Sequence, residues 1–310
     1  MNVDLIDFDS VDGVELNGMI YGNNKNKIVI SVNGMSSNCF RKRERKIAEE
    51  VEKIGFDFFF FNNRGSELVK YAISKTEKGK AKFLAGTSYE NPEDGLFDIF
   101  GAMRKVLELG YKNIILEGHS LGCTKIVYTY NKLKEIKDNK IRINEISTEE
   151  ASKLLESIKG VILNSLVDVP RALKIYQGDK FEEYLNYANS KEEEGRVFDI
   201  MPPKSFIHPV SIQTYLKYAK YNANIDFAKY HNDLYEFEEL NNIEIPLFMR
   251  WGNTNEMIEQ SAEKLVKMMN EKIKNSNKDI NYIDGADHGY HNRENELAEQ
   301  IAEFLEKYCK

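Results

Sequence analysis

A serine flanked by two glycines is the segment whose residue types and spacing most clearly indicate chemistry. Gly118-His119-Ser120-Leu121-Gly122 follows an apolar run at residues 113–116 and precedes a stretch with helical periodicity. Between a strand and a helix, this Gly-x-Ser-x-Gly motif holds the serine at the apex of a strained turn with its hydroxyl exposed. We therefore expect Ser120 to be a nucleophile, and a capping serine in an ordinary turn is the alternative.

The elements that must position this serine alternate along the chain. Short apolar runs predict strands at residues 27–32, 56–62, 113–116, 160–164, 247–251 and 279–283. Amphipathic stretches predict helices at residues 41–54, 92–109, 121–133, 256–274 and 292–307. The apolar runs are continuous rather than alternating, which predicts strands buried on both faces. The order is typical of an α/β protein with a mostly parallel sheet covered by helices on both faces.

Three further segments add to this framework. Residues 2–7 and 16–21 flank the turn-like Ser10-Val11-Asp12-Gly13, which predicts an antiparallel pair at the sheet edge. Ser147 and Glu150 have capping-box spacing, which predicts a helix over residues 148–158.

The segment between about residues 170 and 239 shows no clear strand–helix unit. It contains a charged run at residues 191–194, the helix-breaking Met201-Pro202-Pro203 and many aromatic residues. We interpret residues 169–239 as a mainly helical cap inserted into a core of residues 1–168 and 240–310. Tyr215, Tyr218 and Tyr221 have helical spacing, and we expect at least one of them to line a substrate pocket. Packing of the cap onto the core is the alternative role for its tyrosines.

Composition excludes several classes of protein. The 310 residues carry a formal net charge of −7 and no long basic block, so nucleic acid is not an expected partner. Cys39, Cys123 and Cys309 lack paired spacing, which predicts reduced thiols and a cytoplasmic location. The acidic N-terminus does not resemble a secretory signal, and no apolar run reaches the ~18 residues of a membrane span. No cluster has metal-ligand spacing, so we expect neither a metal nor another cofactor.

These motifs together resemble the α/β-hydrolase superfamily over nearly the whole chain. Val32-Asn33-Gly34-Met35 is similar to the family's oxyanion loop, and Gly285-Ala286-Asp287-His288 is similar to its histidine loop. The segment at residues 169–239 lies where the family places its cap. With Leu121-Gly122-Cys123, the chain most resembles a largely uncharacterised bacterial esterase/lipase-like branch.

The resemblance implies which groups assist the serine. Asn33 replaces the histidine usual in the family's His-Gly pair, but an oxyanion hole needs only backbone N–H groups, which Met35 and Leu121 would supply. His288 occupies the position of the family's base. His291 is the competitor, although its place near the start of a helix suggests exposure.

The other three histidines are weaker candidates for the base. His119 should point away from the apex of the turn and be structural. His208 and His231 lie in the cap, where no acid or strand end organises them.

The acid that orients the histidine has three candidates. The family usually has an aspartate three residues beyond the glycine that is Gly252 here, and this position is occupied by Asn255. An amide supplies no charge to stabilise an imidazolium. Glu256 is adjacent, and Asp168 occupies a second location from which the superfamily can supply its acid. We favour Glu256, with Asp168 and Asn255 as the alternatives.

We therefore expect a serine hydrolase that cleaves a carboxylic ester of an apolar or aromatic small molecule through an acyl-enzyme. Thioesters and amides are less favoured substrates. The alternative is a relative that binds a ligand or transfers an acyl group with weak hydrolysis, which the poor acid position motivates.

Overall fold

An eight-stranded sheet forms the centre of the computed structural model, which describes residues 2–77, 79–220 and 224–309. Its strands are β1 (Val3–Asp9), β2 (Glu15–Tyr21), β3 (Lys27–Val32), β4 (Asp57–Asn62), β7 (Asn113–His119), β8 (Ile158–Asn164), β9 (Leu247–Gly252) and β10 (Lys278–Ile283). Their order across the sheet is β1-β2-β4-β3-β7-β8-β9-β10. The six strands β4, β3, β7, β8, β9 and β10 run parallel to one another. At one edge of the sheet, β1 and β2 form the predicted antiparallel pair.

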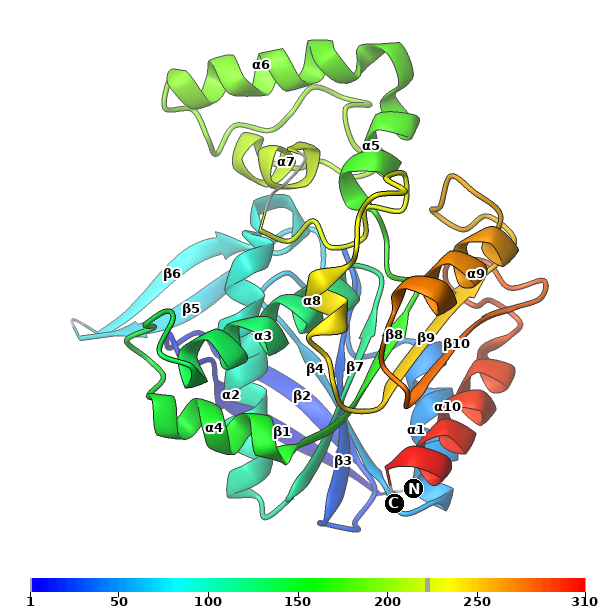
Figure 1. Cartoon of the computed structure of the whole chain (residues 1–310). Helices are drawn as coiled ribbons and strands as arrows, with labels where there is room; N and C mark the ends of the chain where they lie inside the picture. Colours follow the sequence, from blue (N-terminus) through cyan, green and yellow to red (C-terminus); the bar gives the residue numbers. More distant parts are fainter. Residues whose placement is uncertain (1, 78, 221–223, 310) are drawn as a thin grey trace.

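Helices cover both faces of this sheet, as the continuous apolar runs predict (Figure 1). On one face lie α1 (Lys42–Lys53) and α10 (Glu294–Tyr308), and on the other lie α2 (Gly95–Glu108), α3 (Leu121–Lys137), α4 (Thr148–Ser157) and α9 (Ala262–Lys272). Neighbouring residues of β7 belong to different cores, since Ile114 and Leu116 pack under α2 and α3 whereas Ile115 packs under α1 and α10. Two apolar cores on opposite faces therefore hold the sheet rigid.

The start of α9 differs from the prediction of a helix from residue 256. The helix begins at Ala262, where the Ser261 hydroxyl accepts a hydrogen bond from the Lys264 N–H and caps the first turn. The preceding residues form a loop because the Glu256 carboxylate turns back to accept the Gly252 N–H at 2.9 Å. The sequence pattern alone does not reveal this inward turn.

The helix predicted after Ser147 is present as α4, and the Ser147 hydroxyl caps it by accepting the Glu150 N–H at 3.2 Å. The hairpin of β5 (Lys70–Thr76) and β6 (Gly79–Ala85) was not predicted, because its strands are mostly exposed and lack an apolar pattern. Its two strands pair with each other, and its links to the rest of the chain include a bridge between Val14 and Ser74 and an ion pair between Lys75 and Asp9.

The segment after β8 carries α5 (Val169–Gln177), the short 3₁₀ turn Gly178–Lys180, α6 (Phe181–Glu193), α7 (Ile212–Ala219) and α8 (Glu238–Asn241). Figure 1 shows α5, α6 and α7 above the carboxyl ends of the parallel strands, whereas α8 lies beside α3. We keep the name cap for residues 169–239, and the division of the chain into a core and a cap remains our proposal.

A buried ion pair joins this cap to the core. The Lys125 ammonium on α3 donates to the Glu90 carboxylate, and both side chains are almost completely buried. The Tyr218 hydroxyl donates to the same carboxylate at 3.3 Å, and the Thr214 hydroxyl donates to the Glu90 carbonyl at 2.9 Å. Helix α7 is therefore anchored to the charged pair beneath it.

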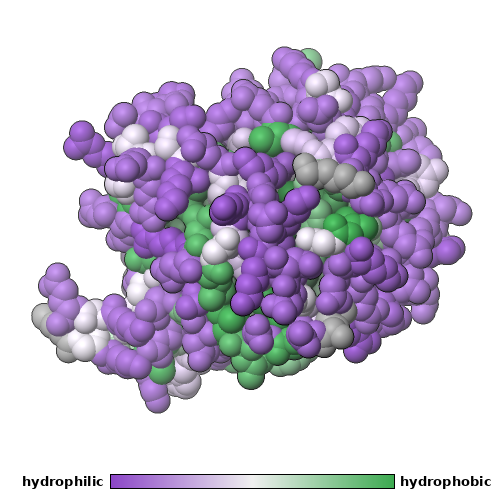
Figure 2. Space-filling view, turned by 90° about the horizontal axis from the view of Figure 1, so that it is seen from below, coloured by the Kyte–Doolittle hydropathy of each residue, from purple (hydrophilic) through white to green (hydrophobic). Residues whose placement is uncertain are grey.

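The face of the molecule seen in Figure 2 is mostly hydrophilic, with apolar residues gathered in its lower middle. Within the described residues, no helix combines the length and apolarity needed to cross a membrane. Cys39, Cys123 and Cys309 are free thiols in the buried interior.

Removing one member of the buried pair should destabilise the protein strongly. We expect Lys125→Met to lower the free energy of unfolding by about 3–5 kcal/mol, because it leaves the Glu90 carboxylate buried without a counter-charge. Lys132→Met is the matched control on the same helix, because Lys132 pairs with Glu135 at the surface and should contribute less than about 1 kcal/mol. Urea unfolding of both variants measures the difference, and equal losses would contradict the role of the buried pair.

Candidate active site

Ser120 lies in a tight turn between the end of β7 and the start of α3. Its φ of 54° and ψ of −123° place a non-glycine residue in a strained, left-handed region. The flanking glycines are required by close packing. A Cβ at Gly118 would lie 2.7 Å from the Cys123 nitrogen, and one at Gly122 would lie 2.0 Å from the Val32 carbonyl oxygen. The turn thus holds the serine at the apex that the motif predicts.

The structure brings Ser120, His288 and Glu256 together in one hydrogen-bond chain. The Ser120 Oγ lies 2.9 Å from His288 Nε2, and His288 Nδ1 contacts Glu256 Oε1 on the other side of the ring. A carboxylate can only accept, so Nδ1 carries the proton and Nε2 is free to accept the serine proton. This is the arrangement that a nucleophile, a base and an orienting acid require.

Glu256 is held in place by groups from two other loops. Its Oε2 accepts the Gly252 N–H and the Ser165 hydroxyl, each at 2.9 Å, and the side chain is 2% exposed. Gly252 is needed because a Cβ there would lie 2.2 Å from the Ala286 carbonyl oxygen. Thr254 N–H donates to the same carbonyl at 2.9 Å. The loops that carry the acid and the histidine are therefore directly attached.

The two alternative acids occupy other positions. Asn255 has a φ of 47° and forms the turn that directs Glu256 inward. Asp168 caps α5 by accepting the Arg171 N–H at 3.1 Å, and its other oxygen contacts His231 Nδ1 at 2.6 Å. Neither Asn255 nor Asp168, both within the described part of the chain, hydrogen bonds to His288. The expectation that no acid organises His231 is thus wrong.

The loop expected to form the oxyanion hole packs against the serine turn. A Cβ at Gly34 would lie 3.0 Å from the Ser120 Cβ, so the loop approaches as closely as a glycine allows. Met35 and Leu121 both line the cavity beside Ser120, and the Met35 N–H donates to none of the described residues. The side chain of Asn33 points inward and donates to Ser66 Oγ at 3.2 Å. Asn33 therefore shapes the loop and leaves its backbone donors available.

His119 does not point away from the site, contrary to the expectation from the motif. Its Nε2 lies 2.7 Å from the His288 carbonyl oxygen, and the two rings are 5.0 Å apart. Burial lowers the pKa of His119 well below its usual range, and the charges of Arg43 and His288 add to this effect. A neutral ring that donates to this carbonyl positions the histidine loop. In the sequence, only the position of His119 next to Ser120 indicates this role.

The two remaining histidines, His208 and His291, both line the cavity but differ in exposure. His208 from the cap lines the cavity, lies 3.0 Å from Ser36 Oγ and has its pKa lowered by burial. The sequence pattern gave no reason to place it there. His291 is exposed, as expected, and its Nδ1 contacts Asp287 at 2.8 Å rather than the serine.

The cavity over Ser120 measures about 460 Å³. Cap and loop side chains form an apolar part that comprises Val167, Val169, Ala172, Leu173, Tyr176, Phe206, Ile207 and Met257. Tyr215 and Tyr218 do not line it, because both are completely buried and their hydroxyls bond to Gln177 and Glu90. Tyr221 lies outside the described residues. Among the described tyrosines of the cap, Tyr176 lines the cavity.

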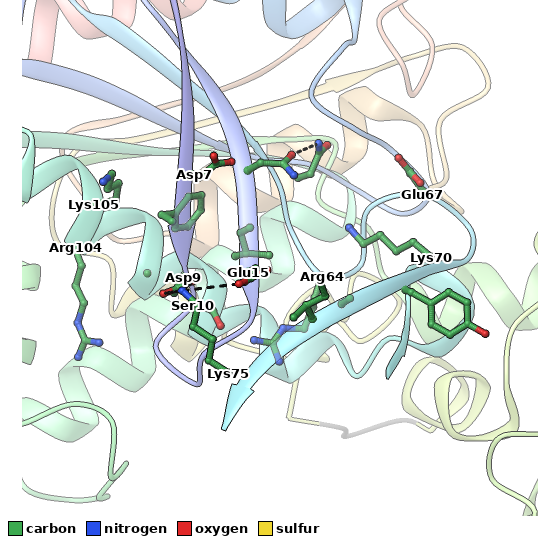
Figure 3. A pocket seen from close by; sticks show the side chains of 18 of the residues that line it. Asp7, Asp9, Ser10, Glu15, Arg64, Glu67, Lys70, Lys75, Arg104 and Lys105 are labelled. Carbon is green, nitrogen blue, oxygen red and sulfur yellow. Dashed lines mark hydrogen bonds and ion pairs between the residues drawn. The ribbon is translucent and has the colours of Figure 1, made fainter. Parts of the chain in front are cut away.

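A larger groove of about 890 Å³ lies between the β1–β2 edge and the β5–β6 hairpin (Figure 3). Several of its charged side chains form ion pairs, such as Lys75 with Asp9 and Arg64 with Asp12. Its serine, Ser10, donates to Asp12, and no histidine of the described chain lines it. Among the described residues, no three His, Cys, Asp or Glu side chains gather closely enough to hold a metal ion. We therefore take the residues around Ser120 as the candidate active site.

A buried carboxyl group lies beneath this turn. Glu117 accepts hydrogen bonds from Ser31 Oγ at 2.5 Å and Asn164 Nδ2 at 2.7 Å. Complete burial, together with the neighbouring Glu44 charge, raises the pKa of Glu117 to about 7, although Arg43 acts in the opposite direction. The turn that carries Ser120 is thus built over a titratable group.

Comparisons with known proteins agree with this architecture. The family model described as "Protein of unknown function (DUF1749)" matches residues 94–309. Similar structures include Est1E from Butyrivibrio proteoclasticus with bound ferulic acid, at 14% identity, TM-score 0.62 and coverage of 97% of this chain and 98% of that chain. The α/β hydrolase GrgF from Penicillium sp. sh18 has 13% identity, TM-score 0.63 and 99% coverage of both chains. No curated protein matches. The chain has the α/β-hydrolase fold.

Glu117 should make stability depend on pH. Its pKa is raised from 4.5 to about 7 by folding, so its stabilising contribution is present below pH 4.5 and is lost as the pH rises through 7. Between pH 5 and pH 8 we expect wild type to lose about 2–3 kcal/mol of unfolding free energy relative to Glu117→Gln. Urea unfolding at both pH values measures this loss. The control Glu108→Gln, a substitution at an exposed position, should lose unfolding free energy between the two pH values as wild type does. If Glu117→Gln also loses as much as wild type, the titration of Glu117 is excluded.

Proposed function

The chain belongs to this DUF1749 family, whose description assigns no function, and we propose that it is a serine hydrolase that cleaves carboxylic esters. The observation that carries the proposal is the continuous hydrogen-bond chain from Glu256 through His288 to Ser120. The strained turn, the exposed cavity and the loop with free backbone donors support the same conclusion. Each group has the partner that acyl transfer requires.

In the proposed first half-reaction, Ser120 Oγ attacks the carbonyl carbon of the ester and His288 Nε2 takes the hydroxyl proton. Glu256 stabilises the imidazolium through Nδ1–H, and the N–H groups of Met35 and Leu121 bind the oxyanion. When the tetrahedral intermediate collapses, the bond from carbon to the alcohol oxygen breaks and His288 gives its proton to the leaving alcohol. The product is an acyl-Ser120 ester.

Water completes the cycle in the second half-reaction. His288 Nε2 takes a proton from the water as its oxygen attacks the acyl carbon, and the same oxyanion donors act again. The proton then returns to Ser120 Oγ, which releases the carboxylic acid. Apart from the substrate and the attacking water, the proposed steps use only side chains and backbone groups of this chain.

The cavity supports an apolar or aromatic small-molecule ester as the partner. Its apolar part is supplied by the cap and by the loop after β8, with Tyr176 and Phe206 as its aromatic members. Pockets that bind small molecules commonly combine such apolar walls with a few polar groups. The ferulic acid bound to Est1E is an aromatic acid, which is consistent with this choice.

A protein that only binds a ligand is less well supported. That alternative rested on the amide at Asn255 in the acid position, and Glu256 contacts His288 instead. Transfer of the acyl group to an alcohol in place of water would use the same acyl-Ser120 intermediate, and the cavity geometry favours no such acceptor.

Loss of the nucleophile should abolish the reaction. Ser120→Ala removes the attacking oxygen from an exposed turn without disturbing a core, so we expect no ester turnover above background and no labelling by a fluorophosphonate probe. Hydrolysis of 4-nitrophenyl butyrate and gel fluorescence of the labelled protein measure the two effects. Turnover near the wild-type rate would sink the assignment of Ser120.

The acid can be identified by comparing two carboxylates in the same region. Glu256→Gln should lower kcat on the same ester by about 10³-fold or more, because an amide neither charges nor correctly orients His288. Asp168→Asn is the control, since Asp168 bonds to His231 and caps α5, and kcat should change little. If Asp168→Asn has the larger effect, the orientation of His288 proposed here is wrong.

A further inference from the structure

The cavity beside Ser120 joins an apolar part to a cationic part. The cationic part is the start of α1, where Arg41, Lys42 and Arg43 follow one another and all line the cavity. A purely apolar ester would leave these three charges without a function in binding. The arrangement therefore raises the question of which group they meet.

Arg43 is the buried member of these three cations, whereas Arg41 and Lys42 are exposed. Its side chain lines the cavity although the residue is only 7% exposed. Nη2 donates to Glu44, but Nε is buried without a hydrogen-bond partner and Glu44 Oε2 is likewise unpartnered. Nη1 donates to none of the described residues. A buried guanidinium with unused donors is costly unless an acceptor reaches it.

The backbone at the same point adds positive potential. Helix α1 begins at Lys42, and no side chain caps its first turn, so its first N–H groups face outward from the helix end. The acid of this first turn is Glu44, which is already engaged by Arg43. Burial is the main cause that lowers the pKa of His119, next to Ser120, and the charges of Arg43 and Arg41 add to this lowering.

The carboxylates that pair with these cations do not fully cancel their charge. Glu294 also lines the cavity, but it pairs with Lys42 at 3.0 Å. Glu44 is the ion-pair partner of Arg43. Arg41 uses its Nε to bond to the Ser37 hydroxyl, which is neutral. One positive charge therefore remains in excess among Arg41, Lys42, Arg43, Glu44 and Glu294.

We propose that the ester substrate carries a carboxylate group, which Arg43 and the start of α1 bind while the apolar remainder lies against the cap. The proposal rests on the proposed ester hydrolysis and specifies its substrate class. An excess of one positive charge matches a monoanion better than a doubly charged phosphate. A planar carboxylate also fits the guanidinium donors of arginine.

The first experiment compares charged and neutral esters of similar size. The acyl-side pair is 4-nitrophenyl hydrogen glutarate and 4-nitrophenyl valerate. The alcohol-side pair is the butyryl ester of 4-hydroxybenzoate and that of 4-hydroxybenzamide. In at least one pair, wild type should have a kcat/KM for the charged ester at least about tenfold above that of the neutral one. Equal or lower values for the charged ester in both pairs would overturn the proposal.

A double variant removes the cation together with its ion-pair partner. Arg43→Gln combined with Glu44→Gln keeps polar side chains in place, and the ratio of charged to neutral kcat/KM should fall about tenfold or more. Arg45→Gln is the matched control, because Arg45 lies on the same helix, is exposed and does not line the cavity. The control should keep the wild-type ratio. An unchanged ratio in the double variant would exclude Arg43.

A binding measurement separates this proposal from the hydrolase proposal. Calorimetric titration with benzoate and benzamide tests carboxylate recognition without any reaction. Wild type and Arg45→Gln should bind benzoate at least about tenfold more tightly than benzamide, and the double variant should lose this difference. If no ester is hydrolysed but this pattern holds, ester hydrolysis fails and carboxylate recognition stands. If esters are hydrolysed but benzoate has no advantage in wild type, carboxylate recognition fails alone.

Discussion

The close contact of α3 with the ends of β3 and β7 is the constraint on which the site depends. Gly118 and Gly122 have no room for a side chain, because backbone atoms of Cys123 and Val32 occupy the space where a Cβ would lie. This contact forces the backbone of Ser120 into a left-handed conformation that ordinary helix starts do not need. Tight packing of the two cores around β7 compensates for the strain and keeps the hydroxyl at the carboxyl end of the sheet.

Once the serine is there, its partners must come from loops at the same edge of the sheet. Met35 follows β3, Ser165 follows β8, Glu256 follows β9 and His288 comes after β10. These strands are neighbours of β7 or of one another, so parallel pairing places all their carboxyl ends together. The contact of Gly252 with Ala286 then fixes the acid loop to the histidine loop. Strand order and this contact between loops thus bring together residues that are far apart in sequence.

The surroundings of these groups divide the cavity by chemistry. The cap supplies apolar side chains, and the Glu90–Lys125 pair anchors α7 of the cap from below. Helix α1, which covers the opposite face of the sheet from α3, supplies positive charge. Its Arg43 lines the cavity, pairs with Glu44 and counteracts the raised pKa of the buried Glu117. An ester bound there would meet a neutral reactive centre, an apolar wall and a cationic helix start, which is a combination suited to amphipathic small molecules.

Local patterns were sufficient to predict the parallel sheet, the edge pair and the turn at Ser120, because strand burial, helix periodicity and the two glycines act within a few residues. Helical spacing placed Tyr215 and Tyr218 on one face but not against a particular surface, and packing turned them toward Gln177 and Glu90. Which of Glu256, Asn255 and Asp168 contacts His288 likewise depends on the tertiary structure. It depends on a left-handed turn at Asn255 and on Gly252 and Ser165 donating to the Glu256 carboxylate, contacts between loops that no linear pattern records.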